Sequence, residues 1–131
     1  MRPSRVRRLT ASLVVIAVAC RGGEREREVL ARIELPPTPA EHRAGDSLFT
    51  ANCASCHGQS ARGSDQGPPL LHIIYEPSHH SDASFVLAAQ RGVAAHHWGF
   101  GNMPPQPQVD SAALRKIIAY VRWAQREVGI D

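Results

Sequence analysis

Cys53 and Cys56 are separated by two residues, and His57 follows directly. Cysteines at positions i and i+3 lie about one helical turn apart, so both sulfurs can reach one edge of a flat ring. The histidine next in the chain can then bring its imidazole under the centre of that ring. This pattern is typical of covalent haem attachment through two thioether bonds. It predicts a chain that folds around a bound group and takes part in electron transfer.

Three other kinds of site can contain a Cys-x-x-Cys pair. A thioredoxin-like redox pair needs a βαβ setting, which the surrounding sequence does not offer. A structural zinc site needs two more ligands. The candidates are the pairs His79-His80 and His96-His97, whose adjacent side chains seldom both reach one tetrahedral ion. A disulfide across two intervening residues is possible but strained, so all three stay open as alternatives to haem.

The segment from Gly45 to Gly58, which contains this motif, resembles the opening of a small monohaem cytochrome c domain. The likeness covers roughly residues 41 to 130. Gly67 to Leu70 resembles the loop on the histidine side of the haem, and Gly101 to Pro105 resembles the methionine loop on the other side. Ile117 to Trp123 resembles the terminal helix of the family. Motifs that occur together in this order are far more specific than any one of them.

For the site, this resemblance implies one haem c per chain, attached covalently through Cys53 and Cys56. His57 is implied as an iron ligand that donates its Nδ1 proton to the carbonyl oxygen of Pro68. Such a bond fixes the imidazole tautomer and raises the basicity of the ring. Leu70 is implied as a further haem-binding residue.

Met103 is the candidate for the sixth iron ligand, opposite His57. It is the only methionine besides the first residue, and the two prolines after it stiffen the loop that presents its sulfur. A soft sulfur favours ferrous iron, so His/Met ligation gives a higher potential than His/His ligation. The rival ligands are His96 and His97, a few residues upstream, with His72 and the pair His79-His80 behind them.

Hydrophobic periodicity predicts three helices. The first runs from residue 39 or 40 to 55, the second over 81–91 and the third over 110–128. We expect Ser81 or Asp82 to cap the start of the second helix, and Asp110 to cap the start of the third. No run alternates with a period of two residues, so an all-α fold is expected.

The resemblance implies the cytochrome c fold, in which three main helices pack around the covalently attached haem. The N- and C-terminal helices are then expected to cross. Gly45 would let the backbones approach closely against Ile117 and Tyr120, and Phe49 would fill the space beside Tyr120 or Trp123.

Residues 1–19 predict a secretory signal peptide, because four arginines precede an apolar run too short to span a bilayer. Their removal changes the formal net charge from +3 to −1, since the segment contains no acidic residue. The basic character of the chain therefore belongs to the signal. With Lys116 as the only lysine, nucleic acid is not an expected partner.

Cys20 is left over once a haem takes the other two cysteines, and it directly follows the predicted signal peptide. A bacterial lipoprotein carries its acylated cysteine at this place, although Ala17 stands where leucine is usual. We expect residues 20–40 to form a lipidated cysteine with a charged and proline-rich tether, followed by the haem domain over 41–131. The expected location is the periplasmic side of a bacterial membrane, lipid-anchored; the alternative is a soluble periplasmic protein with a spare thiol.

A filled sixth position leaves no site for a substrate at the iron, and no nucleophile with an adjacent base stands out. We therefore expect a one-electron carrier rather than an enzyme. Its partners would be redox proteins, among them respiratory complexes, with no small-molecule substrate. Trp98 and Phe100 are expected in its docking face. The alternatives are a haem-bearing subunit of a membrane dehydrogenase or oxidase complex, and a haem gas sensor.

Overall fold

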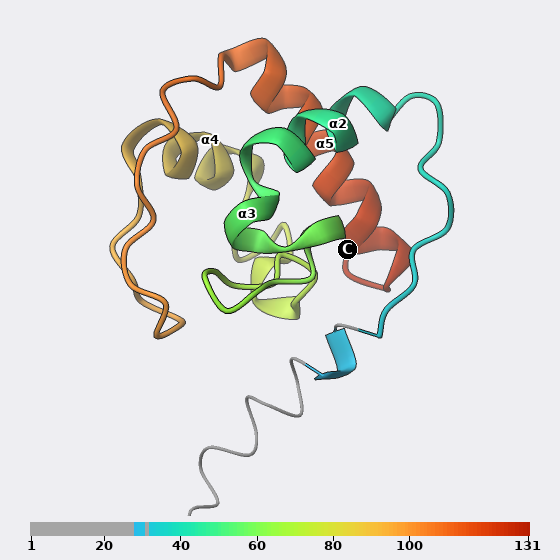
Figure 1. Cartoon of the computed structure of the whole chain (residues 1–131), viewed down its shortest axis with the longest axis horizontal. Helices are drawn as coiled ribbons and strands as arrows, with labels where there is room; N and C mark the ends of the chain where they lie inside the picture. Colours follow the sequence, from blue (N-terminus) through green and yellow to red (C-terminus); the bar gives the residue numbers. More distant parts are fainter. Residues whose placement is uncertain (1–27, 31) are drawn as a thin grey trace, which may run out of the picture.

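The computed structural model describes residues 28–30 and 32–131; the predicted signal peptide, Cys20 and the start of the tether lie outside the described residues. The main helices are α2 (Arg43–Asn52), α3 (Ala54–His57), α4 (Asp82–Arg91) and α5 (Ser111–Glu127) (Figure 1). Two short 3-10 helices, η1 (Gln59–Ala61) and η2 (Ile73–Tyr75), lie between α3 and α4. The described part contains no strand, so the all-α prediction is confirmed. None of its helices is long and apolar enough to cross a membrane.

The prediction of one continuous helix from residue 39 or 40 to 55 is wrong. Residues 40–42 form turns, and the chain leaves the helical conformation at Cys53, where φ is −123°. A regular α-helix has φ near about −63°. The break separates α2 from α3, although the Cys53 N–H still bonds to the Phe49 carbonyl at 2.8 Å. As a result, Cys56 and His57 lie on a helical turn of their own.

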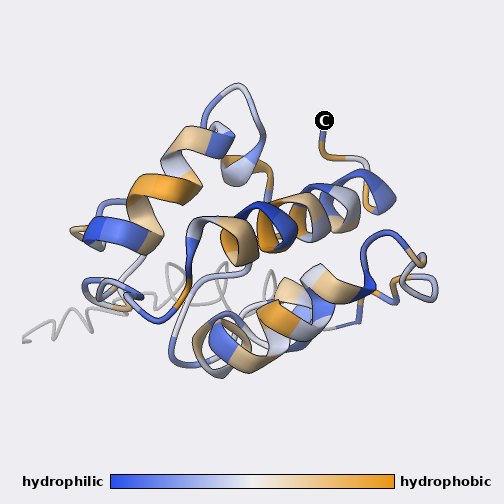
Figure 2. Cartoon of the chain, turned by 90° about the horizontal axis from the view of Figure 1, so that it is seen from above, coloured by the Kyte–Doolittle hydropathy of each residue, from blue (hydrophilic) through white to orange (hydrophobic). Residues whose placement is uncertain are grey.

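The two later helices begin as their sequences predict. Ser81 occupies the N-cap position of α4, where its hydroxyl lies 3.3 Å from that of Ser84 and does not cap a backbone N–H. At the start of α5, the carboxylate of Asp110 accepts a 2.7 Å bond from the Ala113 N–H. Gly92 and Gly129, at the ends of these helices, have φ of 75° and 80°, which glycine adopts at little cost. Figure 2 shows that the helices carry both hydrophobic and hydrophilic residues, as amphipathic helices do.

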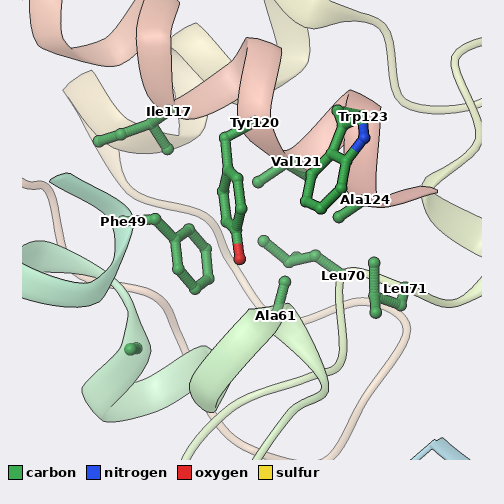
Figure 3. Close-up of a cluster of buried hydrophobic side chains, with 10 residues drawn as sticks. Phe49, Ala61, Leu70, Leu71, Ile117, Tyr120, Val121, Trp123 and Ala124 are labelled. Carbon is green, nitrogen blue, oxygen red and sulfur yellow. The ribbon is translucent and has the colours of Figure 1, made fainter. Parts of the chain in front are cut away.

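The crossing of α2 and α5 forms the core that supports the site (Figures 1 and 3). Phe49 from α2 packs against Tyr120 from α5, with ring centroids 5.6 Å apart and both side chains almost fully buried. At Gly45, an added Cβ would stand 2.2 Å from the carbonyl oxygen of Lys116 and 2.8 Å from the Cβ of Tyr120. The close approach expected at Gly45 is therefore present, with Lys116 as its nearest backbone contact.

A buried arginine ties α5 to the segment before α4. Arg122 donates hydrogen bonds to the carbonyl oxygens of Tyr75 and His80, to the Asp82 carboxylate at 2.8 Å and to the Gln125 side chain at 2.7 Å. The Arg122 side chain is 9% exposed, whereas that of Asp82 is 67% exposed. Because two of the acceptors are backbone carbonyls, the guanidinium fixes the path of the chain around His80. The sequence interpretation assigned no role to Arg122.

We expect Arg122→Met to lower the free energy of unfolding by about 2 kcal/mol, because it leaves acceptors without their donor in a buried place. Asp82→Asn is the matched variant, and it should cost less than about 1 kcal/mol because its carboxylate is largely solvated. Denaturant titration of the haem-loaded protein measures both values. Equal losses in the two variants would show that the ion pair, rather than the carbonyl contacts, carries the stabilisation.

Candidate functional site

Cys53, Cys56 and His57 line a cavity of about 750 Å³ between α3 and α4. Both cysteines are free thiols, so the disulfide alternative is not realised. Burial, followed by the neighbouring Cys56, raises the pKa of the Cys53 thiol to about 11. This thiol is therefore protonated at neutral pH, and its partner is exposed at the edge of the turn.

His57 is oriented by the loop that follows η1. Its Nδ1 lies 2.9 Å from the Pro68 carbonyl oxygen, and since a carbonyl can only accept, Nδ1 donates and Nε2 is the nitrogen left for a metal. Burial lowers the pKa of His57, and the bond to Pro68 raises it in part. Gly67 allows this loop to pass close to α3, because an added Cβ would stand 2.9 Å from the Cys56 carbonyl oxygen. Leu70 is buried and lines the same cavity.

Met103 lines the cavity from the segment between α4 and α5. An isolated antiparallel bridge holds it to Val93 through N–H to carbonyl bonds of 3.0 and 2.9 Å. Gly92 permits this pairing, because its φ is 75° and an added Cβ would stand 2.5 Å from the Met103 carbonyl oxygen. The methionine loop is thus fixed to the end of α4.

The aromatic residues near Met103 also line the cavity. Trp98 and Phe100 are partly buried, with ring centroids 6.3 Å apart. Within the described part of the chain, the indole nitrogen of Trp98 is buried without a hydrogen-bond acceptor of normal geometry. Burial raises the pKa of the Tyr75 phenol to about 12, and the nearby Trp98 indole lowers it in part. The Trp98 indole and the Tyr75 phenol thus lie beside each other at the cavity wall.

The helix α4 supplies a wall of the cavity that the sequence interpretation did not assign to the site. Phe85, Ala88 and Ala89 line it from this helix, and Ile118 and Val121 line it from α5. The sequence signal that points to this wall is the recurrence of apolar residues along 81–91.

The structure does not bring the cysteine pair and the histidines together into a zinc site. Over residues 28–30 and 32–131, the group that could hold a metal consists of His79, His80 and His97, without a cysteine. Ligand pockets usually measure roughly 300–1,000 Å³ and have mostly apolar walls. A cavity of about 750 Å³ with paired thiols and an oriented imidazole fits a large flat group attached by thioether bonds.

An all-α fold with a Cys-x-x-Cys-His turn and a methionine around one apolar cavity defines a c-type haem domain. The family model described as "Cytochrome c" matches residues 43–125, and the chain belongs to this family. The cofactor of this domain is haem c, bound covalently at the spacing of Cys53 and Cys56, and the chemistry of the domain is haem-based electron transfer.

Among curated proteins, the chain is 28% identical over 89 residues to the "Cbb3-type cytochrome c oxidase subunit CcoP" of Rhodobacter capsulatus. A second sequence of this subunit from the same species gives the same figures. The matched region is 66% of this chain and 30% of each relative, so the chain spans less than a third of their length. No solved structure matches significantly.

Proposed function

We propose that the chain is a one-electron carrier in which His57 and Met103 would hold the iron of the bound haem. The observation that carries this proposal is the single cavity lined by the Cys53 to His57 turn and by Met103, which lie far apart in the sequence. Haem, when bound, supplies the ferric/ferrous couple. The chain's own contribution is to hold, orient and enclose it.

Three features of the chain serve this role. Pro68 fixes the tautomer of His57 so that Nε2 is presented as a ligand. The bridge to Val93 holds the loop of Met103 in place, and a soft thioether ligand favours the ferrous state. Leu70 and apolar residues of α4 line the cavity, and an apolar surrounding also disfavours the charged ferric state.

Because His57 and Met103 would both hold the haem iron, we infer that the protein handles no substrate of its own. Carbon monoxide tests this inference on the reduced, haem-loaded chain at neutral pH. A carrier is expected to bind the gas slowly and weakly, because a ligand must first leave the iron. Fast and stoichiometric binding would contradict the carrier and favour a haem gas sensor.

A second candidate function is a haem-bearing subunit of a respiratory oxidase or dehydrogenase complex. Its support is the similarity to an oxidase subunit, of which the matched region forms only a part. Purification from native membranes in mild detergent separates the candidates. Stoichiometric co-purification with larger redox subunits supports the subunit, whereas recovery of the chain alone supports the free carrier.

We further propose that the protein is exported to the periplasmic side of a bacterial membrane and anchored by acylation of Cys20. The supports are the signal-like residues 1–19 and the cysteine that follows them. The mass of the mature N-terminal peptide tests the anchor. An acylated Cys20 is expected, and an unmodified thiol at this residue would mean that the carrier is soluble in the periplasm.

A further inference from the structure

Besides His57, four of the seven histidines line the haem cavity. They come from two segments: His79 and His80 precede α4, and His96 and His97 follow it. The ring centroids of His97 lie 5.3 Å from His79, 5.2 Å from His80 and 4.1 Å from His96. Imidazoles so close together repel each other when protonated. A ligand that all of them contact would explain their proximity better than separate exposure to solvent.

Three of these imidazoles already stand near metal-binding distance. The ligand nitrogens of His79, His80 and His97 all lie within 4.8 Å of one another. Bonds of about 2.0–2.1 Å to a tetrahedral zinc ion would place the nitrogens about 3.4 Å apart. The difference is at most roughly 1.4 Å. Small side-chain rotations can close it, because His79 and His97 are exposed and His80 is only half-buried.

His80 is the preorganised member of the group. Its Nδ1 lies 2.7 Å from the Ile74 carbonyl oxygen, and because that oxygen can only accept, Nδ1 carries the proton and Nε2 is the nitrogen left for a metal. The backbone on either side is fixed as well, since Arg122 donates to the carbonyl oxygens of both Tyr75 and His80. A metal-binding histidine commonly has such an outer hydrogen bond.

The segment that carries His97 is also anchored. Val93 pairs with Met103, and the Ala95 N–H donates to the Asn102 side chain at 2.9 Å. Each of the two segments that carry the histidines is therefore fixed by its own hydrogen bonds. A metal ion between them would join the turn before α4 to the methionine loop. The group contains no carboxylate, which disfavours calcium and magnesium, whereas neutral imidazoles suit zinc, copper and nickel.

We propose that His79, His80 and His97 form a second metal site, which binds one zinc-class transition-metal dication and leaves a coordination position open. The site is distinct from the haem iron, because its ligands come from neither the Cys53 to His57 turn nor Met103. Its bound ion would cross-link the two segments that close this side of the haem cavity.

The test is calorimetric titration of the full-length, haem-loaded protein with Zn²⁺ after chelator treatment. One zinc ion per chain is expected, with the haem absorption spectrum unchanged. His80→Ala and His97→Ala, made separately, are each expected to weaken binding by at least about tenfold, because each removes a direct ligand. The matched control is His42→Ala, which removes a histidine that stacks on Trp123 outside the group and should leave zinc affinity unchanged.

Absence of stoichiometric zinc binding would overturn the proposal, and so would equal affinity in the wild type and the His97→Ala variant. Since His97 is exposed, this variant is expected to fold normally, and its haem spectrum verifies that it does. His96→Ala checks the ligand set, because His96 lies outside the convergent three. A loss in His96→Ala as large as in His97→Ala would show that the three-ligand assignment is wrong.

Discussion

The Met103→Ala variant is expected to lose the sulfur-to-iron charge-transfer band of the oxidised protein completely. Its reduction potential should fall, because the soft ligand that favours ferrous iron is gone. The reduced variant should also bind carbon monoxide more than about tenfold more tightly, since the methionine no longer competes for the iron and the binding-competent fraction rises. Absorption spectroscopy, redox titration and gas binding measure the three effects.

His96→Ala and His97→Ala are the matched controls for Met103→Ala, because both histidines line the same cavity and precede Met103 by a few residues. Each control should keep the charge-transfer band. If a histidine variant lost the band and Met103→Ala kept it, that histidine rather than Met103 would be the sixth ligand. The backbone bridge between Val93 and Met103 does not depend on the side chain, so the loop is expected to keep its place in Met103→Ala.

The Gly45→Val variant is expected to lose about 3 kcal/mol of unfolding free energy. Helix propensity alone predicts the opposite sign, since glycine is the poorer residue in a helix interior by up to about 1 kcal/mol. Steric contact dominates because the first added atom would stand 2.2 Å from the Lys116 carbonyl oxygen. That neighbour is backbone, so α2 and α5 must move apart, and overpacking of this kind costs about 1–3 kcal/mol, occasionally more. Denaturant titration of the haem-loaded protein gives the value.

Gly99→Ala serves as the control for Gly45→Val. An added Cβ at Gly99 meets no atom within 4 Å, so the change in stability should stay within about 0.5 kcal/mol. A stability of Gly45→Val equal to that of the wild type would show that the two helices can separate at no cost. The crossing would then not be what supports the cavity.

The helical elements could be predicted because their signals are local. Asp110 bonds to an N–H three residues away, and Gly92 ends α4 with its own backbone conformation, so neighbouring residues are sufficient. The break at Cys53 was missed because the apolar positions continue across it. Periodicity reports which residues face the core, and it does not report a change in backbone direction within one turn.

The residues of the candidate site also divide into those that local sequence predicts and those that it does not. The roles of Cys53 and His57 follow from spacing along the chain, whereas Pro68 and Met103 could be assigned only through the resemblance to a family. The burial of Arg122 could be predicted neither from spacing along the chain nor from the resemblance to a family. An arginine in an amphipathic helix is normally a solvated residue, and its burial depends on carbonyl groups that lie more than 40 residues away.

The sequence by itself therefore determined the attachment motif, the helical class and the positions where α4 and α5 begin, since each depends on residues within a turn or two of one another. Tertiary structure alone decided that Met103 shares a cavity with His57, that Arg122 fixes the chain around His80, and that His79, His80 and His97 converge. These contacts join segments far apart in the chain, and which distant segments meet depends on how the whole core packs around the crossing of α2 and α5.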